Sequence, residues 1–315
     1  MSRNLSKVGI IGAGRVGNAV ANGLVMMGVC VSVVLYNRTM SKAEGEAWDI
    51  EDTIPLLEEC DVLPSDRYED LADCDVIVVT IGAQAKEGQD RLNLLGDNAG
   101  IMRETIKELD RVAPNAVVII ISNPVDVLTR IAIDTSTRPE NLIIGSGTVL
   151  DTARTKYQLG KLLDVSKQEV NLYVIGEHGK TAFFLWSSAL IGAIPLDKFP
   201  FPKGTSFAQI KADYPEIIHE RAYAIGERKG GTSYGISTVA CQLVDTILRD
   251  EKKIFTVSVK ADSYYKIGEE VVLSLPCVIG KQGIARKLLA PLNDEEQSLL
   301  EKSAQQLIEA YNSIL

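Results

Sequence analysis

The chain reads VGIIGAGRVG at residues 8–17, an apolar run followed by three glycines in the pattern G-x-G-x-x-G. The apolar run predicts a buried strand, and the amphipathic stretch at 16–27 predicts a helix. In this context Gly12 would permit a tight turn, Gly14 the close approach of a pyrophosphate, and Gly17 close packing of helix on strand. The stretch therefore predicts a dinucleotide site within an α/β fold, with an ordinary tight turn as the alternative.

The rest of the first half alternates short apolar runs with amphipathic segments, which predicts right-handed crossovers and a parallel sheet. The second half mixes helices and strands irregularly. The predicted strands of the first half are 8–11, 31–36, 76–80, 117–122 and 142–144, and its predicted helices are 16–27, 42–52, 99–112 and 126–134. In the second half we predict helices at 151–163 and from 293 or 294 onward, and strands at 170–175, 254–259 and 271–279.

Composition excludes several classes of protein. The 315 residues carry a formal net charge of -9, which opposes general nucleic-acid binding because phosphates require clustered Lys and Arg. No apolar run reaches the roughly 18 residues of a membrane span. Five scattered cysteines without a CxxC oppose a disulfide framework or a metal site and fit a reducing cytoplasm. They are Cys30, Cys60, Cys74, Cys241 and Cys277.

The two histidines of the chain differ in setting. His178 lies in the motif GEHG directly after an apolar run, where a glycine-flanked strand end can face a cleft. His219 lies in a polar stretch at 214–221 that predicts a surface helix, so we interpret it as structural. Asp151 and Arg154 stand three residues apart on a predicted helix and share one face. They form either a functional pair beside a cleft or a simple ion pair on the helix.

A polar segment, GAQAKEGQDR at 82–91, follows one of the predicted strands. Its glycines suit a lid, in which case Arg91 would reach a ligand only when the lid closes. A solvated loop between strand and helix is the alternative. Asn123 ends another predicted parallel strand, and ligands of such sheets bind at the carboxyl ends of the strands.

The end of the second predicted strand bears on the cofactor. Asp or Glu normally stands there and binds the ribose 2′-hydroxyl, but this chain has Asn37 and Arg38. Asn37 can bond the hydroxyl without repelling a 2′-phosphate. Arg38 could pair with that phosphate, or could simply stack on the adenine or face solvent. NAD and NADP are therefore both expected cofactors.

Seven segments together resemble the L-lactate/malate dehydrogenase family, most closely its L-lactate and L-2-hydroxyisocaproate dehydrogenase branch. They occur in the family's order and span nearly the whole chain: GIIGAGRVG, EGQDRLNLL, ISNPVDVLT, IGSGTVLDTAR, GEHG, KGGTSYG and LSLPCVIGKQGI. The resemblance implies a Rossmann doubly wound parallel sheet at 1–145 followed by an α+β substrate domain at 146–315, in homodimers or homotetramers. It also implies reversible hydride transfer between NAD or NADP and an L-2-hydroxy acid, the 2-oxo acid in reverse.

The resemblance also implies roles for individual residues. His178 would exchange a proton with the substrate C2 oxygen, and Asp151 would hold its tautomer and stabilise its cation. Arg154 would bind the substrate carboxylate. Arg91 would polarise the 2-oxo carbonyl, and Asn123 would bond or orient the same oxygen. The remaining implied positions are Thr232 in the substrate pocket and, at the cofactor, Gly12, Gly14, Val16, Gly17, Asn37, Arg38, Gly82, Asn123 and Ile236.

One position departs from the family pattern. Six residues before the lid arginine, where Gln goes with lactate and Arg with malate, this chain has Ala85. A C4 carboxylate would lack its partner there, and the pocket would be wider and less polar. We therefore expect 2-oxo monocarboxylic acids larger than pyruvate, although Lys86 could bind an anionic group. Lys156 and Asn171 replace the Arg and His that bind fructose 1,6-bisphosphate in some relatives, so we expect no activation.

Three alternative functions remain. The first is L-lactate dehydrogenase proper, and the second is malate dehydrogenase, which Ala85 opposes. The third is a non-catalytic dinucleotide-binding sensor, because a fold does not determine a function. The joint presence of Arg91, Asp151, Arg154 and His178 opposes the sensor.

Overall fold

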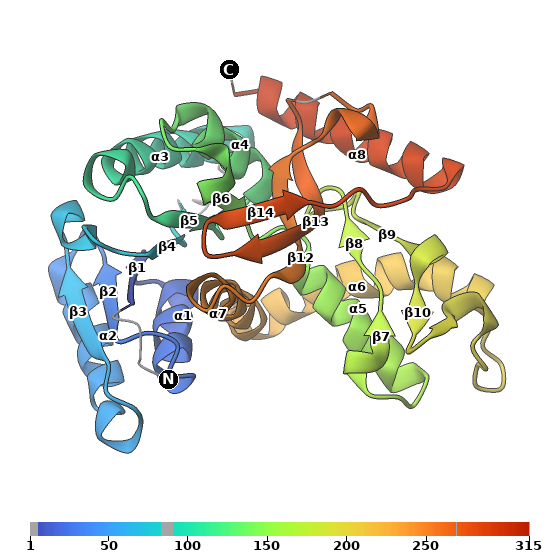
Figure 1. Ribbon diagram of the computed structural model, residues 1–315, viewed down its shortest axis with the longest axis horizontal. Helices are drawn as coiled ribbons and strands as arrows, with labels where there is room; N and C mark the ends of the chain where they lie inside the picture. The colour runs from blue at the N-terminus through green and yellow to red at the C-terminus, as the bar shows by residue number, and fades with distance from the viewer. Residues whose placement is uncertain (1–5, 83–90, 269, 315) are drawn as a thin grey trace.

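The computed structural model describes residues 6–82, 91–268 and 270–314, with the backbone alone at 91–94. Within this part, a nine-stranded sheet runs in the order β14-β13-β12-β6-β5-β4-β1-β2-β3 (Figure 1). Strands β1 to β6 are parallel. Their order, 3-2-1-4-5-6, is that of a dinucleotide-binding doubly wound sheet, so the predicted fold is confirmed. They span Lys7–Ile11, Ser32–Tyr36, Asp61–Ser65, Val76–Val79, Val117–Ile120 and Ile143–Gly145.

Strand β3 was not predicted from the sequence. It forms the edge of the sheet and pairs only with β2 among the described strands. Its side chains alternate between buried and exposed, Leu63 is exposed, and Pro64 removes a backbone donor. An edge strand tolerates proline and needs only one apolar face. The continuous apolar run that marks the other parallel strands is therefore missing here.

Helices cover both faces of the sheet (Figure 1). Helices α1 (Arg15–Met26) and α2 (Met40–Glu51) lie on one face, and α3 (Arg91–Val112) and α4 (Val125–Thr135) lie on the other. Helix α7 (Tyr234–Leu248), from the second half of the chain, also packs on α1. The contact is close, because a Cβ at Gly23 of α1 would lie 2.8 Å from the Cys241 sulfur of α7.

The second half of the chain also extends the sheet. Strands β12 (Lys253–Lys260), β13 (Val272–Gly280) and β14 (Gly283–Lys287) are antiparallel, and β12 joins β6 where Ser258 meets Gly145. The strands predicted at 254–259 and 271–279 are therefore confirmed, whereas β14 was missed. The two halves of the chain share one sheet.

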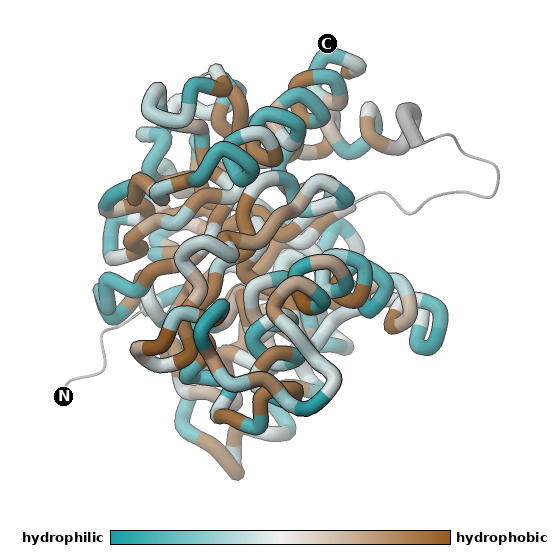
Figure 2. Tube along the Cα trace, turned by 90° about the vertical axis from the view of Figure 1, so that its right-hand side faces the viewer, coloured by the Kyte–Doolittle hydropathy of each residue, from teal (hydrophilic) through white to brown (hydrophobic). Residues whose placement is uncertain are grey.

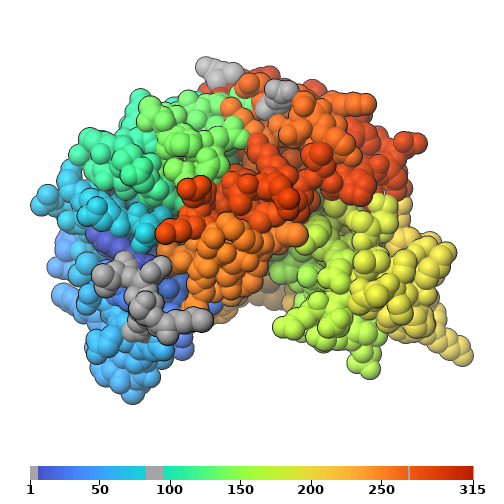
Figure 3. Space-filling view, in the orientation of Figure 1, coloured from blue at the N-terminus to red at the C-terminus, as the bar shows by residue number. Residues whose placement is uncertain are grey.

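The elements from α5 to α6 form a smaller lobe, yellow-green in Figure 3, beside a hollow in the surface. It is built on α5 (Val149–Leu162) and α6 (Phe207–Lys229), and its own apolar core includes Phe184 and Tyr214. The single strand predicted at 170–175 is wrong, because its two ends pair in different small sheets. The short strands are β7 Val170–Asn171, β8 Val174–Ile175, β9 Phe183–Phe184, β10 Leu190–Ile191 and β11 Ile194–Pro195.

The last helix, α8 (Asp294–Asn312), begins where the sequence predicted. The Asn293 side chain accepts from the Glu296 backbone N–H, and the Glu296 carboxylate accepts from that of Asn293. This reciprocal capping box satisfies two backbone donors that a helix start leaves free. Figure 2 shows the hydrophobic segments gathered in the interior and hydrophilic ones on the outer helices.

Candidate active site

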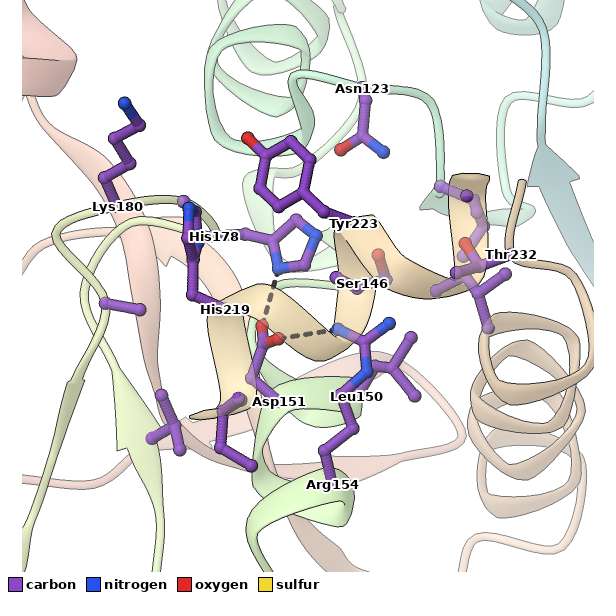
Figure 4. Close-up of a pocket in the computed structure, with 18 of the residues that line it drawn as sticks. Asn123, Ser146, Leu150, Asp151, Arg154, His178, Lys180, His219, Tyr223 and Thr232 are labelled. Atoms are coloured by element: carbon purple, nitrogen blue, oxygen red, sulfur yellow. Dashed lines mark hydrogen bonds and ion pairs between the residues drawn. The ribbon is translucent and has the colours of Figure 1, made fainter. Parts of the chain in front are cut away.

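A cavity of about 480 Å³ opens at the carboxyl edge of the sheet. Asn123 reaches it from the end of β5, Ser146 from the end of β6, and other lining residues come from α1, α5, α6 and α7. Figure 4 shows its principal polar side chains. The cavity brings together seven of the residues predicted from the sequence: Val16, Asn123, Asp151, Arg154, His178, Thr232 and Ile236.

Asp151 joins His178 to Arg154 (Figure 4). The His178 Nδ1 lies 2.6 Å from Asp151 Oδ2, and Arg154 Nη1 donates to Asp151 Oδ1 at 3.0 Å. Because Nδ1 is held by the carboxylate, Nε2 is the ring nitrogen left for a ligand. The ion pair expected on the helix is therefore present, and both of its members line the cavity; its function stays a prediction.

Burial and charge oppose each other in this dyad. Burial alone would raise the pKa of the Asp151 carboxyl, but His178 and Arg154 outweigh it and the pKa lies below its usual value. Burial alone would lower the pKa of the His178 imidazole, but the charge and hydrogen bond of Asp151 outweigh it and the pKa lies above its ordinary 6.5. The site therefore favours a protonated imidazole against an ionised carboxylate, which is an oriented proton donor.

A second carboxylate, Asp126, lies behind His178 and was not singled out from the sequence. Its Oδ2 accepts the backbone N–H of His178 at 2.7 Å, and its Oδ1 accepts from the Ser258 hydroxyl at 2.6 Å. Burial raises the pKa of Asp126 to about 6, against the two hydrogen bonds. Its ionised form adds to the charge that favours protonated His178. Asp126 thus acts on the imidazole without lining the cavity.

Helix α8 also supports the GEHG segment. The buried Ser303 hydroxyl accepts the Glu177 backbone N–H at 2.6 Å and lies 3.1 Å from the Thr181 hydroxyl. A Cβ at Gly176, whose φ is +90°, would lie 2.8 Å from that hydroxyl oxygen. This position therefore requires glycine for its backbone conformation and for space.

The turn between β1 and α1 has the shape that a pyrophosphate requires. Gly12 has φ +112°, and a Cβ at Gly17 would lie 1.8 Å from the Gly12 carbonyl oxygen, so helix and turn approach too closely for any other residue. A Cβ at Gly14 would meet nothing within 4 Å. Open space therefore faces the Gly14 backbone at the helix N-terminus, where a phosphate would bind. These residues fit a dinucleotide.

Asn37 and Arg38 follow β2, the parallel neighbour of β1. The Asn37 Oδ1 accepts the Thr39 backbone N–H at 2.9 Å. Its side-chain NH₂ is therefore the group that remains to donate a hydrogen bond to a ribose hydroxyl. The Arg38 side chain is exposed.

The predicted lid lies mostly outside the described residues. Ala85 and Lys86 fall there, as does the side chain of Arg91, whose backbone begins α3. Gly82 is described and is exposed after β4. The lid, its closure and the role of Arg91 stay predictions.

Helix α6 contributes a wall that the sequence analysis missed. Pro215, Ile218, His219, Ala222 and Gly226 line the cavity, and their spacing of three and four residues marks one helix face. His219 was interpreted as a structural residue of a surface helix. The helix is confirmed and is largely exposed, but the half-buried His219 side chain lines the cavity that contains His178 (Figure 4). A polar helix gives little sign of which face it turns inward.

Other kinds of site are not seen in the part of the chain that the structure describes. There, no three His, Cys, Asp or Glu side chains are grouped as metal ligands. The helices described include none with both the length and the apolar character that a bilayer crossing demands. All five cysteines lie in the described part of the chain, are buried and form no disulfide.

Comparison with known proteins agrees with this architecture. Residues 6–145 match the family model described as lactate/malate dehydrogenase, NAD binding domain, and residues 148–315 match lactate/malate dehydrogenase, alpha/beta C-terminal domain. An L-lactate dehydrogenase of Clostridium botulinum (strain Loch Maree / Type A3) is 36% identical over 312 residues, 99% of this chain and 98% of the relative. One of Moorella thermoacetica is 38% identical over 307 residues, 96% of each chain.

Solved structures are similar as well. A lactate dehydrogenase from a Medee basin deep-sea metagenome library superposes with a TM-score of 0.93 at 32% identity and 99% coverage of both chains. The minor L-lactate dehydrogenase of Enterococcus mundtii, in a ligand-bound form, gives 0.93 at 28% identity and 98% coverage of both chains. The fold and cavity thus define a two-part dinucleotide-binding protein. The chain belongs to the lactate/malate dehydrogenase family.

Proposed function

We propose that the protein is an NAD-dependent L-2-hydroxy acid dehydrogenase that reversibly reduces a 2-oxo monocarboxylic acid. The observation that carries this proposal is the linked set Arg154–Asp151–His178 in one cavity with the end of the dinucleotide turn. The relatives named L-lactate dehydrogenase support the same reaction class. The L configuration rests on the family resemblance.

Each residue of the set has a separate task in this reaction. When bound, the nicotinamide supplies or accepts the hydride. His178, protonated and held at Nδ1 by Asp151, gives its Nε2 proton to the C2 oxygen and takes it back in the reverse direction. Arg154 binds the substrate carboxylate with the N–H groups that Asp151 does not occupy. Asn123 and, after lid closure, Arg91 would polarise or orient the C2 oxygen.

For the substrate, we propose a side chain larger than the methyl group of pyruvate, such as a branched-chain or aromatic group. Ala85 stands where relatives have a larger polar residue that contacts the substrate side chain, so the pocket is expected to be wider there. The small residues Ala222 and Gly226 on α6 leave further room along the cavity wall. Thr232 also lines this pocket. Lactate dehydrogenase proper is the second candidate, favoured by the names of the relatives. A malate dehydrogenase is disfavoured because Ala85 cannot pair with a C4 carboxylate.

For the cofactor, we propose NAD, with NADP also accepted. Asn37 offers its NH₂ group to a ribose hydroxyl and, unlike a carboxylate, does not repel a 2′-phosphate. The exposed Arg38 is close enough in sequence to pair with such a phosphate.

We also propose a cytoplasmic homodimer or homotetramer with its chain divided near residue 145. Large apolar side chains on and beside α1 and α2, namely Met26, Trp48 and Leu56, are exposed in the single chain and would be covered by a partner subunit. The buried cysteines, none of them in a disulfide, suit a reducing compartment. Neither nucleic acid nor a membrane is a proposed partner.

An initial-rate panel tests the function and its specificity together. It crosses NADH and NADPH with pyruvate, oxaloacetate, 2-oxoisocaproate and phenylpyruvate. We expect the highest kcat/KM for the two bulky monoacids. Pyruvate ranking first would favour lactate dehydrogenase proper, and oxaloacetate ranking first would contradict the role given to Ala85. NADH use without any NADPH use would leave Arg38 without a role in the cofactor site.

The His178→Asn variant separates an enzyme from a non-catalytic sensor. We expect kcat/KM to fall by about 10²–10⁴-fold, the usual contribution of general acid–base catalysis. NADH binding, followed by fluorescence, should stay unchanged because His178 is not assigned to the cofactor. Absence of turnover by the wild-type protein, with NADH still bound, would favour the sensor.

A further inference from the structure

The side chain of Arg15 crosses from the dinucleotide turn to the end of helix α6. Arg15 is the first residue of α1, directly after Gly14, and its Nη1 lies 3.5 Å from the Lys229 carbonyl oxygen at the last turn of α6. The carboxyl end of a helix carries partial negative charge, which favours a cation. The guanidinium therefore lies beside the turn while it remains exposed to solvent.

Two glycines provide the surface on which this guanidinium rests. A Cβ at Gly230 would lie 3.2 Å from Arg15 Nη2, and a Cβ at Gly231 would lie 2.5 Å from Arg15 Nη1. Any side chain at Gly231 would therefore displace the guanidinium. Gly230 and Gly231 have φ of +74° and +140°, so both also suit glycine in backbone conformation.

Arg15 is not itself a lining residue of the cavity, but it lies beside two residues that are. Val16, its neighbour in sequence, and Gly231, its neighbour in space, both line that cavity. The contact of Arg15 Nη1 with the Lys229 carbonyl leaves further N–H donors on a group that suits phosphate oxygens. Lys229 is turned elsewhere, since its ammonium donates to Ser233 Oγ at 3.1 Å and lies 3.9 Å from the Tyr234 ring centre.

We propose that Arg15 is a cofactor-binding residue whose guanidinium contacts the dinucleotide pyrophosphate, and that Gly231 keeps the space it occupies. The inference rests on the proposed function of the G-x-G-x-x-G turn. The Arg15 guanidinium would then contact both the pyrophosphate and the segment that carries Thr232. The cofactor and the substrate wall would therefore be positioned by the same segment.

Fluorescence titration of NADH with the full chain tests the contact. We expect Arg15→Gln to raise the Kd about 10- to 100-fold, the effect of one hydrogen bond to a charged group, with kcat little changed. ADP-ribose, which retains the pyrophosphate, should lose affinity to the same extent, whereas adenosine should not. Lys107→Gln removes an exposed positive charge on α3 and should leave every Kd unchanged.

A double-mutant cycle tests the role of Gly231. Gly231→Ala should weaken NADH binding in the wild-type background, but should add nothing in the Arg15→Gln background, although it should lower Tm in both through backbone strain. Equal Kd values for wild type and Arg15→Gln would overturn the inference. Failure of the wild-type protein to bind NADH or to reduce any 2-oxo acid would instead contradict the proposed function.

Discussion

At the scale of single residues, the protonation state of His178 determines whether the site is ready to reduce a 2-oxo acid or to oxidise a 2-hydroxy acid. Asp151 raises the pKa of His178 above 6.5 against the effect of burial. Reduction of a 2-oxo acid requires the protonated imidazole, so kcat/KM should be level at low pH and fall as pH rises through the pKa of His178. The reverse reaction requires the neutral imidazole and should rise over the same range.

Asp151→Asn should move the fall in reduction rate to lower pH. Without the carboxylate charge, burial dominates and lowers the pKa of His178, so the protonated fraction is lost earlier. The low-pH plateau should also drop by about 10²–10⁴-fold, because the amide no longer secures the imidazole cation. The measurement is the pH profile of kcat/KM, and a midpoint equal to that of the wild type would contradict this account.

Asp126→Asn is the matched control for that profile. The amide can still accept the His178 backbone N–H through its oxygen and can donate to Ser258, so the local geometry is kept. Only the weaker of the two negative charges acting on the imidazole is removed. We expect a smaller shift of the midpoint in the same direction, with the plateau within about tenfold of the wild type. A shift as large as that of Asp151→Asn would mean that charge alone, without the Nδ1 contact, sets the pKa.

At the scale of elements, the capping box of α8 is a local device with a measurable effect. Asn293→Ala removes the acceptor of the Glu296 N–H and should cost about 1 kcal/mol of unfolding free energy. Thermal denaturation should show a fall of about 2–4 °C in Tm per kcal/mol. Lys302→Ala, at an exposed position of the same helix, should change Tm by far less. Equal effects of the two substitutions would contradict the capping role.

The same helix shows what a sequence can and cannot predict. Its start was predicted correctly because a cap and an apolar stripe are encoded within a few residues. Its contribution to the site, the Ser303 hydroxyl on the Glu177 backbone, joins residues 126 positions apart and left no local signal. The cavity-facing side of α6, which includes His219, was not predicted for a related reason, because only tertiary packing decides which side of a polar helix faces the cavity.

At the scale of the whole molecule, the order of buried apolar runs in the sequence predicted the parallel sheet. It did not predict that antiparallel strands from the second half of the chain extend this sheet. Strand β12 joins β6 through residues more than a hundred positions apart, and neither strand alone indicates its neighbour. The candidate site was predictable where motifs mark it, at the glycine turn, Asp151, Arg154 and His178. Arg15 and Asp126 emerged only once distant segments were placed beside them.

The shared sheet predicts that the two halves of the chain unfold together. Strands β12 to β14 complete a sheet begun in the first half, and α7 packs on α1, so unfolding either half would expose buried apolar surface of the other. The chain has two tryptophans, Trp48 on α2 and Trp186 in the smaller lobe, where it stacks on Phe184 at 4.9 Å. In the Trp186→Phe variant, Trp48 reports on the first half of the chain. In the Trp48→Phe variant, Trp186 reports on the second half. We expect their urea transitions, measured by fluorescence at equal protein concentration, to coincide with each other and with loss of helical circular dichroism. Two separated midpoints would show that the smaller lobe unfolds independently of the shared sheet.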